Sequence, residues 1–549
     1  MKEKTNKIAV KDVIAVAVIL AAEIFFFSEI IFSEKMPGDL GDGRFVPLIT
    51  DHWWKFFTGR ERFGEIPIFY PYTHALGYSD FHFGYGIIYS ILRVFGMDLY
   101  GAFKWCIILI HAAGSLVMYY LLRNRFKAEV LWALCGTAAF SYCPALSGIS
   151  NHPQLFAAAM LPELLLFFTG FVQGFESRKK RNVYAYLTVV WFVLLTYTSW
   201  YMACFTGIFV LIALIVWLIL LGRRENKTGK MIKGWFKTMG LDSLGWLAAL
   251  VILFIPFLSI YIPVLKEGSF YGFDPTYLPM PVHLLNVGSD NLLMGWFVKL
   301  IKAEENVPSN EFTEGFSVAM IVCFFAAAVM LFKKKKKKHD ISDCIPKSVV
   351  ITVIVCVLLM LKWNEEGDSL WSMVYDVIIP ARAIHAVVRF LLWLTFPISL
   401  IIATTLSKAE LFKKKTVGTV AAAAVLVLVF LFTVNKGGLI CHFERTERTA
   451  FMDAVAEPPA DMNAFFVMDS AMSGKPEYVY QLDAYEIASK YDLKTMNGYS
   501  GHFPAGWGVW SPCSEDYFGY AADWAASHGL SSVYVYDEAA NAWYPFQTE

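Results

Sequence analysis

The chain has 549 residues, of which 57% are hydrophobic, 16% aromatic and only 17% charged, and its 47 Lys and Arg residues balance 47 Asp and Glu residues. Soluble globular proteins are roughly 45–50% apolar and about 25% charged, so this composition excludes a string of small soluble domains. It also excludes a disordered chain, a coiled coil, a disulfide-rich secreted scaffold and a nucleic-acid-binding protein, because no charged or repetitive tract dominates and cysteines number only nine. The sequence therefore predicts an all-α polytopic membrane protein.

Eleven apolar runs approach the length of about 20 residues that a transmembrane helix needs. We expect transmembrane helices at 12–32, 100–122, 128–148, 153–173, 183–199, 201–221, 243–264, 315–332, 347–362, 386–406 and 417–434. The stretch 183–221 is too long for one membrane crossing, so we place a break near Ser199. The first run is too long for a signal peptide and has no cleavage site after it, which indicates an uncleaved anchor.

The basic residues predict the orientation, because Lys and Arg favour short cytoplasmic loops. With a cytoplasmic N-terminus, every strongly basic loop falls on the cytoplasmic side. These loops contain Arg123, Arg125, the run 178–181, Arg223, Arg224, the lysines 333–338 and the lysines 413–415. An odd number of helices then places the C-terminus outside. We therefore expect a multi-pass protein of the cell membrane with an extracytoplasmic C-terminus.

Three long segments are expected outside the membrane, namely the loops 33–99 and 266–314 and the tail 435–549. The chain is accordingly divided into a polytopic transmembrane domain, 1–434, and a small extracytoplasmic α/β domain formed by the tail. The predicted strands and helices of the tail are 464–468, 532–536, 480–490 and 515–528. Cys441 and Cys513 of the tail either form a disulfide or stay reduced, and the sequence leaves this open.

The first external loop begins with the segment Gly38-Asp39-Leu40-Gly41-Asp42-Gly43-Arg44, directly after the first helix leaves the membrane. Carboxylates at the mouth of a membrane cavity act as general bases or bind Mg²⁺ or Mn²⁺. Asp39 and Asp42 are therefore candidate catalytic residues and candidate ligands of a divalent cation, and Arg44 is a candidate substrate-binding residue. The alternative is a Gly-Asp turn that only ends the helix.

The same loop continues with aromatic residues mixed with carboxylates and histidines. Asp51, His74 and Asp80 lie in these stretches. Such a mixture is typical of a carbohydrate site, where aromatic rings stack on sugars and acids bind hydroxyl groups. It is equally typical of an aromatic belt at the membrane interface. The three residues are therefore candidate substrate-binding residues of lower rank.

Two arginines, Arg382 and Arg389, stand where the tenth predicted helix begins. On a helix, residues seven apart share a face. Both lie on the external side, against the trend of the other basic residues, and arginine forks bind phosphate and diphosphate. The alternative is snorkelling of the side chains to the outer headgroups. We favour phosphate binding.

Three further polar residues complete the candidate substrate-binding site. His152 and Gln154 stand at the external start of the fourth predicted helix, close to where the first loop should fold back, although entry into that helix explains them too. Tyr499 lies in the glycine-rich tail loop 496–504. No nucleotide-binding glycine loop occurs in the sequence, which argues against an ATP-driven mechanism.

Together these features resemble the GT-C superfamily of polytopic membrane glycosyltransferases, and within it the YfhO-like bacterial membrane proteins. The resemblance rests on the Gly38 to Arg44 segment and on the motifs Tyr70-Pro71, Ser79-Asp80 and Asn497-Gly498-Tyr499-Ser500-Gly501. It also includes the two arginines of the tenth predicted helix. It extends in architecture along the whole chain, and only the first-loop motif is moderately specific.

The resemblance implies an inverting glycosyltransferase that uses a polyprenyl-phosphate-linked sugar. It implies that Asp39 or Asp42 deprotonates a hydroxyl of a cell-envelope glycan or glycolipid acceptor, and that the two arginines stabilise the leaving phosphate. The membrane lipid, the donor and the acceptor are the expected partners, with no nucleic acid. Cofactors are unknown, and Mg²⁺ or Mn²⁺ dependence stays open. The WWD-type motif of oligosaccharyltransferases is missing, so protein N-glycosylation is not expected.

Two other functions remain as alternatives. A transporter or lipid flippase would depend on carboxylates within the membrane, such as Glu23 and Glu163. A non-catalytic envelope assembly protein would depend on the tail. The sequence does not identify the sugar, the acceptor or the oligomeric state.

Overall fold

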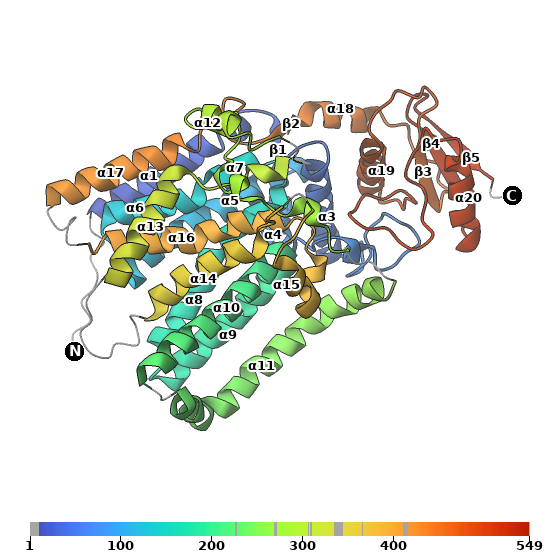
Figure 1. Ribbon diagram of the computed structural model, residues 1–549. Helices are drawn as coiled ribbons and strands as arrows, with labels where there is room; N and C mark the ends of the chain where they lie inside the picture. Colours follow the sequence, from blue (N-terminus) through green and yellow to red (C-terminus); the bar gives the residue numbers. More distant parts are fainter. Residues whose placement is uncertain are drawn as a thin grey trace.

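The computed structural model describes residues 10–225, 228–267, 272–305, 307, 310–333, 344–364, 366–409 and 415–547. It consists of a helical body and, at one end, a small α/β unit formed by the C-terminal part of the chain (Figure 1). Part of the evidence for the predicted orientation lies outside the described part of the chain. This applies to the basic positions 334–338, 413 and 414 and to the side chains of Arg223, Arg224 and Lys415.

Each of the eleven predicted apolar runs corresponds to a helix. These helices are α1 (Val10–Phe26), α5 (Leu99–Tyr120), α6 (Val130–Ser141), α8 (Leu161–Gln173), α9 (Arg178–Thr198), α10 (Trp200–Glu225), α11 (Thr228–Lys266), α13 (Val318–Lys333), α14 (Cys344–Met360), α16 (Phe390–Leu406) and α17 (Lys415–Leu431). The break near Ser199 is confirmed, because Ser199 has an extended backbone (φ −148°, ψ 113°) between α9 and α10.

Six stretches of the described chain are long and apolar enough to cross a membrane. They are Leu99–Arg125, Val130–Gly148, Pro153–Gln173, Trp200–Leu221, Met239–Lys266 and Val387–Leu406. The structure therefore shows a mostly helical, multi-pass membrane architecture. The count of eleven spans and the orientation stay predictions.

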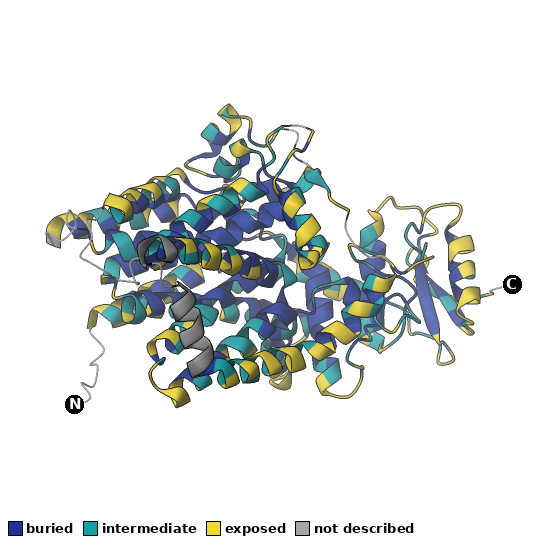
Figure 2. Ribbon diagram, turned by 60° about the horizontal axis from the view of Figure 1, so that its bottom comes forward, coloured by how far each residue is buried: buried dark blue, intermediate teal, exposed yellow. Residues whose placement is uncertain are grey.

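The core of the helical body contains α6 and α16, since 89% of each of their spans is buried. The long helix α11 is different, because only 17% of its span is buried, and exposed residues line its outer side (Figure 2). Leu244, Val251 and Ile252 are among its exposed apolar residues. Such a surface is stable in lipid but not in water.

The first external loop folds back over the helical body. It contains β1 (Lys35–Pro37), α3 (Asp42–Phe57), a 3-10 turn η1 (Ala75–Tyr78) and α4 (Phe83–Val94). β1 pairs antiparallel with β2 (His442–Glu444), which is the first strand after α17, with Met36 opposite Phe443. The start of the tail therefore holds the chain directly before Asp39.

The rest of the tail forms the small α/β unit. It contains α18 (Arg445–Ala454), β3 (Ala464–Met468), α19 (Glu477–Tyr491), α20 (Tyr517–Ser527), β4 (Val533–Asp537) and β5 (Ala542–Phe546). β3 and β4 pair in parallel, and β5 adds antiparallel to the other side of β4. The predicted strands and helices are present, whereas α18 and β5 were not predicted. β5 contains Pro545, which disfavours a strand in general but is tolerated at a sheet edge.

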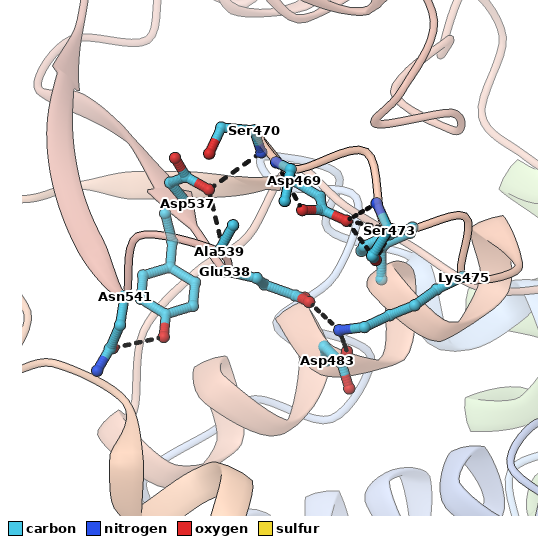
Figure 3. Close-up of polar contacts among 12 residues, drawn as sticks. Asp469, Ser470, Ser473, Lys475, Asp483, Asp537, Glu538, Ala539 and Asn541 are labelled. Atoms are coloured by element: carbon cyan, nitrogen blue, oxygen red, sulfur yellow. Dashed lines mark hydrogen bonds and ion pairs between the residues drawn. The ribbon is translucent and has the colours of Figure 1, made fainter.

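The loops after β3 and β4 are fixed by carboxylates at the carboxyl ends of the two strands (Figure 3). Asp469 accepts hydrogen bonds from the backbone N–H and the hydroxyl of Ser473, and Asp537 accepts one from the N–H of Ser470. Lys475 Nζ lies 2.6 Å from Glu538 Oε2. Both cysteines of the tail, Cys441 and Cys513, carry free thiols in the structure.

A buried cluster of ion pairs joins the first loop to this unit. Arg44 on α3 lies 2.5 Å from Asp483 and 2.9 Å from Glu486, both on α19, and its side chain is completely buried. Arg448 on α18 binds the same two carboxylates. Removing one partner from such a cluster would leave a buried charge uncompensated, which typically costs about 3–5 kcal/mol. The tail and the first loop are therefore packed as one structural unit.

Candidate functional site

The candidate site lies at the N-terminus of α3, where the chain turns from β1 into the helix. The Asp39 carboxylate accepts hydrogen bonds from the backbone N–H groups of Gly41 (2.9 Å) and Gly43 (3.4 Å), so it caps this turn. Burial and the neighbouring charge of Asp42 raise the pKa of Asp39 above its usual value. Gly38 makes the turn possible, because its φ of +103° favours glycine.

Asp42 is the first residue of α3 and the centre of the site. Its Oδ2 accepts hydrogen bonds from His152 Nδ1 (2.5 Å) and Gln154 Nε2 (2.6 Å), and its Oδ1 accepts one from the hydroxyl of Tyr499 (3.4 Å). Burial would raise the pKa of Asp42, but His152, Gln154 and the more distant Arg389 hold it far below its usual value. The side chain is 18% exposed. Asp42 is therefore an ionised, partly exposed carboxylate. We call the group of side chains around it, Asp42, His152, Gln154, Tyr499, Glu311 and Arg389, the recess.

His152 connects Asp42 to a second acid. Its Nε2 lies 3.6 Å from Glu311 Oε1, on the 3-10 turn η6 (Asn310–Thr313). His152 directly precedes the 3-10 helix η3 (Pro153–Met160), which leads into α8. Pro153 at the first position of η3 favours a helix start there and so fixes the position of His152. The predicted loop return is therefore present: α3 and the start of η3 meet at this histidine.

Arg389 closes the other side of the recess. It ends the 3-10 turn η9 (Val387–Arg389) before α16, and its guanidinium binds Glu311 in a bidentate manner, with Nε at 3.0 Å and Nη2 at 2.9 Å. The guanidinium also lies over the ring of Tyr201, 4.7 Å from the ring centroid. Arginine in this arrangement offers a fixed positive charge to a phosphate that enters the recess.

Arg382 does not share this environment. It lies on a separate 3-10 turn, η8 (Ile379–Ala383), and its guanidinium donates to the backbone carbonyls of Tyr375 (3.2 Å) and Asp376 (3.3 Å). The expectation that Arg382 and Arg389 share a helical face is wrong, because extended backbone at Ile384 separates the two turns. The spacing of seven residues therefore does not place Arg382 and Arg389 on a common helical face.

Asp80 lies next to the start of α10. Its Oδ1 accepts a hydrogen bond from the backbone N–H of Trp200, the first residue of α10 (3.0 Å). Burial raises the pKa of Asp80 to about 6, although the N–H group and the charge of Arg389 lower it, and the charge of Asp42 raises it further. Asp80 therefore changes its charge near neutral pH and belongs to the same electrostatic environment as Arg389 and Asp42.

Three other candidates make structural contacts away from this recess. Asp51 is buried and accepts hydrogen bonds from Tyr89 (2.7 Å) and Ser489 (3.1 Å). His74 contacts the hydroxyl of the neighbouring Thr73 through its Nδ1 (3.1 Å). Arg44 is used by the buried ion pairs with α19.

Glu311 and Tyr201 are parts of the site that the sequence did not indicate. Glu311 is separated from Arg389 by 78 positions, and no motif links the two. The pair Glu311 and Glu314 is the only local signal, because two acids stand close together just before an apolar helix. Glu314 is fully buried, and its burial together with the charge of Glu311 raises the pKa of its carboxyl well above the usual value.

The described residues do not support a preformed metal site. No group of three or more His, Cys, Asp and Glu side chains in this part of the chain is placed to hold one metal ion. One oxygen of Asp42 binds side-chain N–H donors and one oxygen of Asp39 binds backbone N–H groups. The described residues thus contain no preformed site for the divalent cation considered from the sequence.

The fold defines a class of membrane protein. It is similar to the crystal structure of the apo oligosaccharyltransferase of Archaeoglobus fulgidus, with a TM-score of 0.50 and 12% identity over 97% of this chain and 70% of that one. This likeness shows that the two chains share a membrane-protein fold.

Two further structures are those of the arabinofuranosyltransferase AftD from Mycobacteria, one of them a mutant. Each has a TM-score of 0.47 and 14% identity, with 83% and 95% of this chain covered. This chain spans only 29% and 36% of those two proteins. No protein-family model and no curated protein sequence matches the chain.

Proposed function

We propose that this protein is a membrane glycosyltransferase that transfers a sugar from a polyprenyl-phosphate-linked donor to a hydroxyl group of a cell-envelope glycan or glycolipid. One observation carries the proposal: Asp42 with its imidazole partner His152, and Arg389 with Glu311, line one recess. A proton acceptor and a phosphate-binding arginine are the two groups that this reaction needs. The GT-C-like fold supports the same class of reaction.

In the proposed reaction the acceptor hydroxyl gives its proton to the Asp42–His152 pair. The acceptor oxygen then forms a bond to the anomeric carbon from the face opposite the phosphate, so the configuration inverts. The bond between that carbon and the phosphate oxygen breaks, and its electron pair stays on the polyprenyl phosphate. Arg389 stabilises this developing charge. Asp80 and Tyr499 are proposed to contact the sugars at the edge of the recess.

The proposal includes the location of the reaction. With a cytoplasmic N-terminus and an external C-terminus, the recess opens on the extracytoplasmic side, where lipid-linked sugars meet envelope acceptors. The finer likeness to YfhO-like bacterial proteins rests on the first-loop and tail motifs. Protein N-glycosylation is not part of the proposal, because the WWD-type motif is missing from the sequence.

Glu23, one of the two carboxylates named for a transporter or flippase, gives little support to that function. Glu23 Oε2 lies 2.8 Å from His111 Nδ1, and its other oxygen accepts a hydrogen bond from Tyr142 (2.9 Å). His111 Nε2 lies 2.9 Å from the carbonyl of Ser141. Both ionisable side chains are thus satisfied inside the helical body, as structural polar groups in membranes usually are.

The test compares cell-envelope glycans with and without the gene by mass spectrometry. We expect one sugar to disappear, to return with the unsubstituted gene, and to stay absent with Asp42→Asn at equal expression. The matched control is Asp453→Asn, because the Asp453 side chain is 74% exposed on α18. Unchanged glycans in the deletion strain would contradict the proposed function.

A further inference from the structure

We propose that Nε2 of His152 is the atom that takes the acceptor proton, and that Asp42 acts through His152 as a positioning residue. This inference rests on the proposed function and assigns the base within the same recess. The sequence pointed instead to Asp39 or Asp42 as the direct base. The contacts of the three side chains distinguish these possibilities.

The hydrogen bonds of Asp42 leave it poorly suited to accept a proton. Oδ2 is used by two strong N–H donors at 2.5 and 2.6 Å. Donors directed at the ionised form stabilise it, so the carboxylate is a weak base. Asp39 is also engaged, because one of its oxygens caps the turn before α3. Neither carboxylate stands with both oxygens free toward the recess.

The same hydrogen bonds make His152 suited to accept the proton of the acceptor hydroxyl. A carboxylate at 2.5 Å from Nδ1 holds the proton on that nitrogen, which leaves the lone pair of a neutral imidazole on Nε2. Gln154, two residues further along, donates to the same carboxylate oxygen and so fixes Asp42 relative to the histidine. The arrangement is the one by which a carboxylate orients an imidazole base and stabilises the imidazolium that forms.

Nε2 of His152 is open to a substrate. Glu311 Oε1 lies 3.6 Å from this nitrogen, which is longer than a hydrogen bond. Glu311 is itself engaged by both nitrogens of the Arg389 fork. The imidazole is 15% exposed, so a hydroxyl group can approach Nε2 from the recess.

The proton balance of the step is complete. The acceptor O–H bond breaks as Nε2–H forms, and the acceptor oxygen attacks the anomeric carbon. The electron pair of the carbon–phosphate bond leaves with the polyprenyl phosphate. The imidazolium then lies between the carboxylates of Asp42 and Glu311, which stabilise its positive charge, while Arg389 faces the leaving phosphate. The charged groups around His152 thus come from α3, η6 and η9.

The experiment uses chemical rescue, in which added imidazole replaces the missing side chain of His152. A purely structural role of His152 would not produce such a rescue. Membranes that contain the full-length protein are incubated with tritiated undecaprenyl-phosphate-linked glucose, galactose, mannose or arabinose, and transfer to envelope acceptors is counted. We expect His152→Ala to lower the rate by about 10²–10⁴-fold. Added imidazole should then restore transfer with saturation kinetics. His152→Gln, which keeps a hydrogen-bond donor for Asp42, should be equally inactive and should not respond to imidazole.

The opposite result is equally specific. If Asp42 is the direct base, His152→Gln keeps most of the activity, and Asp42→Ala is rescued by formate while imidazole has no effect on His152→Ala. The matched control is His528→Ala, on the exposed end of α20, which should transfer at the unsubstituted rate and ignore imidazole. Absence of transfer by the unsubstituted protein with every donor overturns the proposed function itself, and the base assignment with it.

Discussion

Arg389 and Arg382 show how strongly the surroundings decide what a residue can do. Both were predicted to bind phosphate, yet the guanidinium of Arg382 donates to two backbone carbonyls at the surface, whereas that of Arg389 lies in the recess with Glu311 and Tyr201. An arginine that is positioned by a bidentate carboxylate presents its charge in a fixed direction. Of the two arginines, only Arg389 therefore lies where the proposed function places the leaving phosphate.

Arg389→Lys tests this difference. Lysine keeps the charge but cannot form the fork to Glu311, so we expect transfer to fall by about 10–100-fold, a loss of roughly 1.4–2.8 kcal/mol of transition-state stabilisation. The same change at Arg382 should alter the rate by less than about twofold, because the carbonyls accept from an ammonium too. Rates are measured with the tritiated donors. Equal losses in both variants would show that the recess does not distinguish the two arginines.

Asp80→Asn tests the titration of the buried acid. Its folded-state pKa of about 6 lies above the ordinary value of 3.8, so the folded state binds the proton more tightly. The tighter binding of this proton therefore stabilises the folded state fully below about pH 4, and the stabilisation is lost as the pH rises through about 6. Asparagine keeps the acceptor for the Trp200 N–H but cannot ionise.

We therefore expect the melting temperature of the variant, relative to that of the unsubstituted protein, to increase between about pH 4 and pH 7. The measurement is a thermal scan in detergent at several pH values, with Asp453→Asn as the exposed control. A melting-temperature difference that does not change with pH would contradict the raised pKa.

At the scale of elements, the short ladder between β1 and β2 positions the start of α3. Pro37 pairs with His442, and the N–H of Gly38 donates to the carbonyl of Cys441 at 2.8 Å. The chain then turns at Gly38, where an added Cβ would lie 2.4 Å from the Cα of Gly43. The positions of Asp39 and Asp42 therefore depend on a strand that lies about 400 residues later in the sequence.

Gly38→Ala should displace this turn. The Cβ meets backbone atoms that cannot move aside, and φ of +103° is strained for alanine, so we expect a lower melting temperature and a loss of transfer of at least about tenfold. Gly59→Ala is the matched control, because Gly59 also has a positive φ (+75°) but nothing lies within 4 Å of its added Cβ. It should show only a modest loss of stability. If both variants transfer alike, the turn does not position the acids.

At the scale of the whole molecule, the predicted orientation is testable with the protein's own cysteines. Cys441 and Cys513 are exposed, whereas the other cysteines are buried or partly buried in the helical body. With the tail outside, a membrane-impermeant maleimide should label intact cells, and Cys441→Ser with Cys513→Ser should abolish the labelling. Labelling that appears only after the cells are lysed would place the tail in the cytoplasm.

The sequence predicted much of the architecture. Each of the eleven apolar runs contains a helix, because lipid requires long apolar helices, and the break at Ser199 followed from the same length argument. The short segments 464–468 and 532–536, which alternate with predicted helices, indicated β3 and β4, whereas β5 contains a proline and was not predicted. The polar clusters of the first loop and of the start of η3 also stood out, because charged and polar residues are rare near a membrane.

The site, in contrast, was visible only in part. The sequence placed His152 and Gln154 near the returning first loop that contains Asp42, but it gave no reason to group Arg389 and Tyr499 with them. It missed Glu311, and it named Arg44 and, at a lower rank, Asp51 as candidates, although these two are buried in contacts that join α3 to α4 and to the tail. A local sequence window contains the chemical type of a residue but not its partner hundreds of positions away.

By itself, the sequence determined a helical membrane protein with long polar loops and a small α/β tail, because the lipid solvent selects apolar helices regardless of how they pack. The tertiary structure decided which polar residues meet. The first loop, η3, η6, η9 and the tail converge on Asp42 because β1 pairs with β2, Arg44 binds α19, and α16 is buried at the centre. These contacts join distant parts of the chain, and no local pattern of residues encodes them.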